Sequence, residues 1–208
     1  MNTKKLAALT FDDGPNIVTT PQVLGVLERH GIPASFFVCG NNITPESAEV
    51  MRRAVKLGCE IENHSRTHSD MTKLSAEEML SEINFTSDAV ETAVGRRPRF
   101  FRPPYIAYNQ LMFDTIDLTF ICGVGADDWN DEVSAEERFK KITDQVSDGT
   151  VILLHDMEGN FHTVEAIDRI IPAMKSEGYE FVTVSELFSK KEIVPKKNIV
   201  YTSVFQER

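Results

Sequence analysis

The sequence predicts an α/β protein whose strands form a closed or nearly closed barrel of seven β/α units. Short apolar runs alternate with longer amphipathic stretches along nearly all of the 208 residues. Such alternation implies parallel strands joined by right-handed crossover connections. No Gly-x-Gly-x-x-Gly motif follows the first apolar run, so a dinucleotide-binding sheet is disfavoured. A barrel fits these observations better.

Seven apolar runs are the predicted strands. In chain order they cover residues 6–11, 34–38, 59–62, 99–102, 119–124, 150–154 and 180–184. The first run could be misread as part of a signal peptide, but acidic residues follow it at once and a small-x-small cleavage site is lacking. We therefore expect it to be the first core strand.

Helices are expected between these strands because the intervening stretches carry start signals. Thr20 and Thr44 are each followed by proline, which suits the first helical position. Ser75 and Ser134 each begin a Ser-x-x-Glu capping box ahead of apolar residues at helical spacing. Gly31 follows a helical stretch and is interpreted as its C-terminal stop.

One domain is expected over residues 1–208, since no linker and no repeat beyond the β/α alternation is visible. Its lysine-rich end, residues 190–208, is predicted to be a C-terminal extension. This extension would wrap the outside of the barrel or add a small strand around residues 199–204.

Composition argues against two classes of partner. The formal charge is 22 − 32 = −10, which should repel phosphate backbones and disfavours nucleic acid. No apolar run is long enough to span a membrane.

The three cysteines, Cys39, Cys59 and Cys122, are an odd number without a Cys-x-x-Cys pair. We expect them to be small buried core residues rather than a disulfide framework.

Ionisable and aromatic residues follow five of the predicted strands at their carboxyl ends. Barrels of this kind build their sites from the loops at that face, so these residues are expected to converge. They are Asp12 and Asp13 after the first strand, His64 and His68 after the third, Arg102 and Tyr105 after the fourth, Asp128 and Trp129 after the fifth, and His155 after the sixth.

A metal site is predicted at Asp13, His64 and His68. Two histidines four residues apart can bind one ion, and a carboxylate from another strand completes a two-His, one-carboxylate set. Such a set leaves positions open for water, as hydrolytic zinc sites require. His30, at a helix end, is interpreted as structural, and His162 as solvated.

The adjacent carboxylates Asp12 and Asp13 have two interpretations. With Gly14 and Pro15 they could simply form a turn. Two like charges leaving a core strand nevertheless repel unless something neutralises them. Asp13 on a cation and Asp12 beside an arginine, acting as general base, would resolve the repulsion. Gly14 would let the backbone turn sharply enough to keep both carboxylates in the site.

The sequence resembles the polysaccharide deacetylases, also called NodB-type or carbohydrate esterase family four. The resemblance runs from about residue 6 to 188 and rests on five motifs in the family's order. They are Thr10-Phe11-Asp12-Asp13-Gly14, His64-x-x-x-His68, Arg102-Pro103-Pro104-Tyr105, Asp128-Trp129 and Leu153-Leu154-His155.

The resemblance implies a distorted TIM-like (β/α)7 barrel and one divalent ion, Zn²⁺ first, with Co²⁺ or another ion as alternatives. It implies that the ion binds the three residues named above, that Asp12 deprotonates the metal-bound water and that Arg102 orients Asp12. His155 would protonate the leaving sugar atom, tuned by Asp128. The Tyr105 backbone N–H would hold the oxyanion. Trp129 and Leu153 would shape the acetyl pocket.

Two positions depart from the family pattern. Ile106 stands where glycine often follows the tyrosine, and Gly125 where the fourth motif usually begins with aspartate. These loops most resemble acetylxylan esterases of fibre degraders. The leading hypothesis is therefore release of O-acetyl groups from xylan. N-deacetylation of chitooligosaccharide or peptidoglycan N-acetylglucosamine is the alternative, and a non-catalytic carbohydrate-binding relative is a different class.

Two other enzyme classes fit poorly. Aspartyl-nucleophile phosphatases need Asp-x-Asp, whereas Asp12 and Asp13 are adjacent. Two-His, one-carboxylate iron oxygenases use the same ligand types, but an antiparallel β-fold is expected for them.

The expected partner is an acetylated polysaccharide or oligosaccharide, with no nucleic acid and no membrane. Secretion, with a leader absent from this sequence, is expected from the substrate class, and a cytoplasmic location is the alternative.

Overall fold

The computed structural model describes residues 4–206, and its parallel strands form a nearly closed barrel. Seven of the strands lie at the predicted runs, six of them with ends within two residues, while β5 ends three residues before the predicted end. The strands are β1 (Lys5–Asp12), β2 (Ser35–Val38), β3 (Glu60–Asn63), β4 (Phe100–Phe101), β5 (Thr119–Ile121), β6 (Thr150–His155), β7 (Tyr179–Val182) and β8 (Val200–Tyr201). The terminal residues of the expected domain, 1–3 and 207–208, lie outside the described part.

The barrel wall runs in the order β6-β1-β2-β3-β4-β5-β8. It closes above β5, where Val124 forms a parallel bridge with Ile152 of β6. The Val124 N–H donates to Val151 O, and the Leu153 N–H donates to Val124 O, both at 2.9 Å. The regular strand therefore covers only the first part of the predicted run 119–124. Val124, at the end of that run, still pairs with β6.

Two strands distort the barrel. β7 pairs with the first half of β1, through Lys5–Ala8, whereas β2 pairs with the second half. β8 lies in the predicted C-terminal extension and fills the lower part of the wall between β5 and β6. It pairs with β5, and the Val151 N–H of β6 donates to Thr202 O at 2.9 Å. Of the two arrangements expected for the extension, the structure has the added strand.

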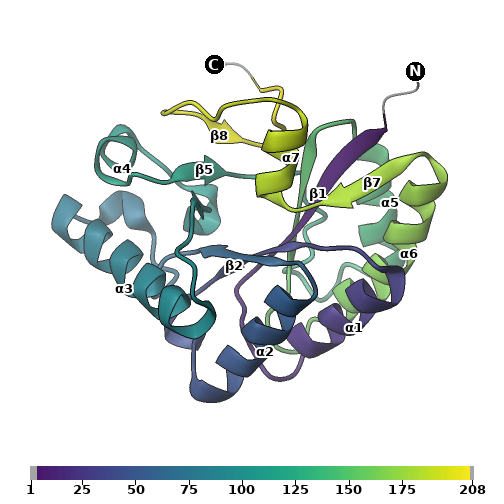
Figure 1. Ribbon diagram of the computed structural model, residues 1–208, viewed down its shortest axis with the longest axis horizontal. Helices are drawn as coiled ribbons and strands as arrows, with labels where there is room; N and C mark the ends of the chain where they lie inside the picture. The colour runs from purple at the N-terminus through teal and green to yellow at the C-terminus, as the bar shows by residue number, and fades with distance from the viewer. Residues whose placement is uncertain (1–3, 207–208) are drawn as a thin grey trace.

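The helices form a layer along the outside of this wall. Neighbouring helices contact one another in the order α5, α6, α1, α2, α3, α4, and α7 lies against β1 (Figure 1). The α-helices are α1 (Thr20–His30), α2 (Pro45–Lys56), α3 (Ala76–Val94), α4 (Gln110–Thr115), α5 (Ala135–Gln145), α6 (Phe161–Ser176) and α7 (Val184–Lys190).

The predicted helix ends are present. Ser75 and Ser134 form reciprocal capping boxes, and Gly31 adopts a left-handed C-cap with φ +60°. We did not foresee α7 as a separate helix, although Thr183 and Glu186 form the same capping box. That signal is visible in the sequence, where it lies directly after the seventh strand.

Alternation along β1 decides which of its side chains face the inside of the barrel. Ala7, Leu9 and Phe11 pack in the layer between the wall and α1 and α6. Leu6 and Ala8 belong instead to the second core cluster, with barrel-lining residues such as Phe37 and Val151. Because side chains alternate with period two, Asp12 belongs to the inward set and projects its carboxylate into the barrel mouth.

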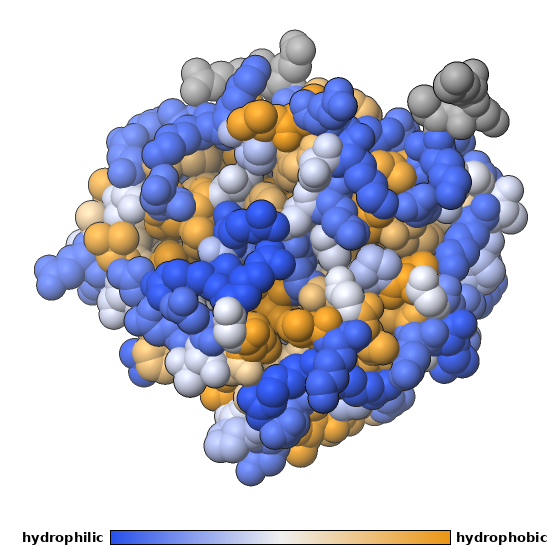
Figure 2. Space-filling view, viewed as in Figure 1, coloured by the Kyte–Doolittle hydropathy of each residue, from blue (hydrophilic) through white to orange (hydrophobic). Residues whose placement is uncertain are grey.

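Polar residues cover much of the face seen in the space-filling view. Figure 2 shows hydrophilic side chains over much of one face, with smaller hydrophobic areas between them. Within residues 4–206, none of the helices has the length and apolarity that a membrane-spanning helix requires. Cys39, Cys59 and Cys122 are unpaired thiols, as expected, but Cys122 is half-buried rather than buried.

Close contact between Val124 and β6 requires a small residue at position 123, so Gly123→Ala is expected to destabilise the fold by about 1–3 kcal/mol. A Cβ atom there would lie 2.7 Å from Leu153 Cβ and 2.9 Å from Leu153 N. Thermal or urea unfolding measures the effect. Gly25→Ala in α1 is the control, because nothing lies within 4 Å and alanine favours the helix, so stability should rise. Unchanged stability of Gly123→Ala would contradict the close contact.

Candidate metal and active site

The three predicted metal ligands lie together at the barrel mouth. Asp13 Oδ1 is 3.5 Å from His64 Nε2 and 3.4 Å from His68 Nε2. One donor atom from each residue lies within 4.8 Å of the other two. A single ion can bind all three once the side chains draw slightly closer around it, because metal–ligand bonds are about 2.0–2.2 Å long.

Hydrogen bonds prepare these side chains for a cation. His64 is buried, and its Nδ1 lies 2.7 Å from the carbonyl oxygen of Arg102, so Nδ1 carries the proton and Nε2 presents its lone pair. Burial and the neighbouring His64 lower the pKa of His68, which favours its neutral, ligating form. Burial raises the pKa of Asp13, but a protonated His64, which would donate to Asp13, and the charges of the other histidines outweigh burial and lower that pKa to about 2. The donor set therefore fits a divalent cation.

Asp12 is held on one side by a buried arginine. Arg102 Nη1 donates to Asp12 Oδ1 at 2.5 Å, and Nη2 donates to Cys122 O at 2.7 Å. The guanidinium also lies over the Phe37 ring, 4.1 Å from its centroid. The other oxygen, Asp12 Oδ2, faces His64 Nε2 at 3.8 Å. Arg102 thus neutralises Asp12 and turns its free oxygen toward the metal ligands, as the resemblance implied.

The turn that carries Asp13 differs from our expectation. The left-handed residue is Asp13 itself, with φ +73°, and Gly14 has no positive φ. Glycine is required at position 14 for space, because a Cβ atom would lie 2.7 Å from both carboxylate oxygens of Asp156. Asp156 is fully buried and accepts a 2.5 Å hydrogen bond from Thr20 Oγ1. The interpretation of Gly14 as the sharply turning residue was wrong.

His155 and Asp128 form a pair beside the metal ligands. In the β1–β6 register Asp12 lies opposite His155, so the two residues occupy neighbouring strand ends. His155 Nδ1 lies 2.8 Å from Asp128 Oδ1, and the His155 backbone N–H donates to Asp128 Oδ2 at 2.8 Å. Burial alone lowers the pKa of His155, but the hydrogen bond and charge of Asp128, with Asp12 and Asp13, raise it to about 9. His155 is therefore protonated near neutral pH and can act as an acid.

We did not predict the residues that hold Asp128. Thr163 Oγ1 donates to Asp128 Oδ2 at 2.7 Å, and Asn160 Nδ2 donates to Asp128 O at 3.0 Å. Buried Arg138 of α5 donates in turn to Thr163 and Asn160. The apolar face of α5 suggested an ordinary surface helix, so an inward arginine was not expected.

Asp128→Asn is expected to move the alkaline limb of the activity profile to lower pH. The protonated form of His155 exists below its pKa of about 9, and loss of the Asp128 charge returns that pKa toward 6.5. The pH dependence of kcat/KM on an acetylated sugar measures the shift. Asp131→Asn, an exposed aspartate of the same loop, is the control. An unchanged alkaline limb in Asp128→Asn would contradict the role of His155 as the acid.

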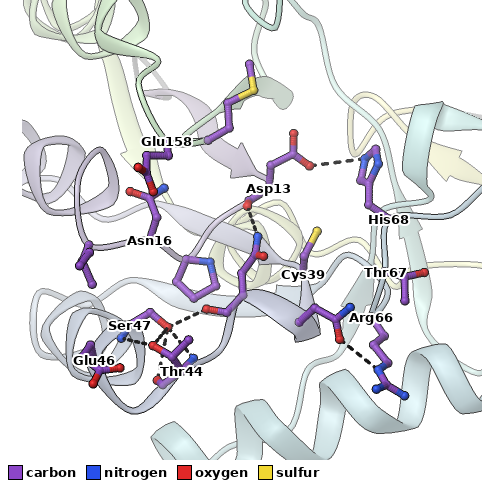
Figure 3. A pocket seen from close by; sticks show the side chains of 15 residues that line it. Asp13, Asn16, Cys39, Thr44, Glu46, Ser47, Arg66, Thr67, His68 and Glu158 are labelled. Atoms are coloured by element: carbon purple, nitrogen blue, oxygen red, sulfur yellow. Dashed lines mark hydrogen bonds and ion pairs between the residues drawn. The ribbon is translucent and has the colours of Figure 1, made fainter.

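Two hollows meet at the metal ligands. One, of about 540 Å³, is lined by Asp12, His155 and the predicted substrate-contacting residues Tyr105, Trp129 and Leu153. The other, of about 770 Å³, shares Asp13 and His68 with the first (Figure 3). Tyr105 and Trp129 are 69% and 62% exposed, so neither is a core residue. Every predicted site residue therefore lies at the barrel mouth or directly beneath it.

The Tyr105 loop has an unusual backbone. Tyr105 and Ile106 both adopt left-handed conformations, with φ +59° and +53°. A β-branched residue there is strained by about 1–3 kcal/mol. This explains why glycine is common at position 106 in the family pattern. None of the hydrogen bonds found among residues 4–206 uses the Tyr105 N–H, which leaves that donor available for a ligand.

Comparison with known proteins decides the family. A family model described as polysaccharide deacetylase matches residues 1–119. This chain belongs to the polysaccharide deacetylase family. It is 46% identical over 198 residues to a bifunctional xylanase/deacetylase of Pseudobutyrivibrio xylanivorans, covering 95% of the chain and 32% of that protein. It is 36% identical over 196 residues to the peptidoglycan-N-acetylglucosamine deacetylase PgdA of Listeria monocytogenes, covering 94% and 41%.

The chain thus spans less than half the length of these two polysaccharide deacetylase relatives. Solved structures agree with the barrel. The Xyl-CE4 domain of a xylanase from the hindgut metagenome of Trinervitermes trinervoides has a TM-score of 0.95 and 44% identity, covering 97% of this chain and 98% of that one. The family 4 acetyl xylan esterase of Clostridium thermocellum, in complex with a cobalt ion, has a TM-score of 0.94 and 42% identity, covering 97% and 100%. The expected family and barrel fold are confirmed.

Proposed function

We propose that this protein is a metal-dependent hydrolase that removes acetyl groups from polysaccharide, with O-acetyl esters of xylan as its substrate. The observation that carries the proposal is the arrangement around one pocket: Asp12 as a base and His155 as an acid stand beside the cluster of Asp13, His64 and His68. The xylan preference is supported by the similar xylanase/deacetylase and acetyl xylan esterase.

We propose Zn²⁺ as the ion, because two imidazoles and one carboxylate form a typical hydrolytic zinc ligand set. The cobalt ion in the Clostridium thermocellum relative supports a divalent site of this kind. When bound, such an ion supplies Lewis-acid polarisation and activates water near neutral pH.

The chain's own groups would divide the proton transfers between them. The free oxygen of Asp12 accepts a proton, while Arg102 holds the other oxygen and keeps the carboxylate oriented. His155, on the neighbouring strand end, donates a proton to the leaving sugar oxygen. The unpaired N–H of Tyr105 would donate to the oxyanion as negative charge develops. Trp129 and Leu153, on the same pocket, would enclose the acetyl methyl group.

N-deacetylation of N-acetylglucosamine polymers is the second candidate, favoured by the 36% identity to the Listeria monocytogenes peptidoglycan deacetylase.

Both substrates are extracellular polymers, so we propose a secreted location. Fractionation of the native organism, with detection of the protein in culture supernatant rather than in the cell pellet, tests that proposal.

Acetate release from acetylxylan is expected to exceed release from chitooligosaccharide, and chelation is expected to abolish both activities. The measurement is acetate formed per enzyme after complete metal removal and after reconstitution with Zn²⁺ or Co²⁺. Reconstitution should restore activity because the ligands remain in place. Faster release from chitooligosaccharide would favour the N-deacetylase. Activity that survives complete metal removal would contradict both candidates.

A further inference from the structure

The loop between the two histidine ligands is bound by a carboxylate from a helix outside the site. Glu82 lies in α3, and its Oε2 accepts hydrogen bonds from Arg66 N at 2.9 Å and Thr67 N at 2.8 Å. Thr67 Oγ1 donates to the same oxygen at 3.1 Å. One glutamate oxygen therefore satisfies two successive backbone donors and a hydroxyl between His64 and His68.

This loop has a conformation that needs external support. Ser65 and His68 both adopt left-handed backbones, with φ +64° and +58°. Such conformations are unfavourable for residues other than glycine and persist where surrounding contacts determine them. These two left-handed residues also turn the backbone N–H groups between them to the same side of the loop. Successive N–H groups arranged in this way form a concave site for an anion. The Glu82 carboxylate occupies this position.

The opposite side of the loop is bound as well. The carbonyl oxygens of Ser65 and Arg66 accept hydrogen bonds from Gly40 N and Asn41 N, each at 3.0 Å. The Arg66 side chain turns toward α3, where its guanidinium lies 4.0 Å from the Phe85 ring centroid. Phe85 is three residues from Glu82, so both lie on the same face of α3.

We propose that Glu82 is a positioning residue that holds His68 in its metal-binding place. Glu82 is neither one of the three ligands nor among the residues that line the pocket containing Asp12 and His155. It acts through the backbone that carries His68, which is 29% exposed and lies at the outer edge of the ligand cluster. His64 is anchored separately by the Arg102 carbonyl oxygen. Loss of Glu82 should therefore release one ligand and leave the other two in place.

The charge of Glu82 contributes to this role. Hydrogen bonds from backbone N–H groups to a carboxylate are stronger than those to a neutral oxygen. Glutamine at position 82 keeps an acceptor oxygen of the same reach without the charge, whereas alanine removes the acceptor. The series Glu, Gln, Ala should therefore weaken metal binding stepwise. Supporting groups of metal ligands typically change affinity by about 10–100-fold.

The proposal rests on the proposed metal site, so the test measures metal binding rather than turnover alone. Co²⁺ is titrated into the metal-free full chain, with Kd from chelator competition and ligand geometry from visible absorption. We expect Glu82→Ala to raise the Kd by about 10–100-fold and to alter the Co²⁺ spectrum. Glu82→Gln should give a smaller increase. Glu77→Gln, an exposed glutamate of the same helix, should match the unmodified protein.

The outcomes separate the two hypotheses. An unmodified protein that binds no Co²⁺ would contradict the proposed function itself. Co²⁺ binding by Glu82→Ala with unchanged Kd and spectrum would overturn the role of Glu82 and leave the metal site standing. Unfolding of the metal-free variants is followed in parallel by circular dichroism. If Glu82→Ala does not fold, an unchanged Kd in Glu82→Gln overturns the proposal, and an intermediate Kd supports it.

Discussion

Asp12→Asn is expected to lower kcat by about 10²–10⁴-fold while the divalent ion remains bound, because a general base contributes about this factor. Asparagine has the same shape and can still accept the hydrogen bond from Arg102, but it cannot take up a proton. The measurement is acetate release from acetylxylan at saturating metal, together with the metal content of the purified variant.

His64→Ala is the matched comparison for Asp12→Asn, since it removes a metal ligand rather than the base. It should lose activity and metal together, whereas Asp12→Asn should lose activity alone. If Asp12→Asn keeps turnover within about tenfold of the unmodified protein, Asp12 is not the general base. Loss of metal from Asp12→Asn would instead make Asp12 a ligand.

Arg102→Leu is expected to destabilise the protein by about 3–5 kcal/mol, the usual cost of leaving a buried charge without its partner. Arg102 and Asp12 are 0% and 2% exposed, so water cannot replace the lost guanidinium without rearrangement. The hydrogen bond to Cys122 O and the contact with the Phe37 ring are lost as well. Urea unfolding of the metal-free protein measures the change.

Two variants test the cause of that destabilisation. In the double variant Asp12→Asn with Arg102→Leu, neither residue of the pair carries a charge, so part of the stability should return. Arg97→Leu removes an exposed arginine that pairs with Asp88 and Glu91, and it should cost at most about 1 kcal/mol. A cost for Arg102→Leu as small as that for Arg97→Leu would refute the buried-pair interpretation.

The site residues could be predicted from the sequence because the order of the strands is enough to place their carboxyl ends at one face of a barrel. Asp13 and His64 follow different strands, yet every strand of the barrel ends at the same face, so convergence follows from the topology. The role of Asp12 was also accessible, since two adjacent carboxylates need separate partners. The helix starts at Ser75 and Ser134 were equally local signals.

Contacts between distant elements were beyond that reasoning. Glu82 lies in the middle of a helix with an ordinary amphipathic pattern, and its partners are 15 and 16 residues away. Arg138 also lies in a helix with an ordinary amphipathic pattern, which predicts an exposed arginine, but it is fully buried. The requirement for glycine at position 14 comes from Asp156, on another strand end. Such features depend on side-chain placement in three dimensions, which periodicity does not determine.

The central strand β1 also governs how this protein folds. It pairs with β2, with β6 more than a hundred residues further on, and with β7 still later in the chain. Contacts of such large sequence separation slow folding, because loop entropy is lost before they form. Asp12 and His155 meet only through the pairing of β1 with β6. The candidate site therefore has no local precursor, and its geometry arises late, when distant parts of the chain have joined.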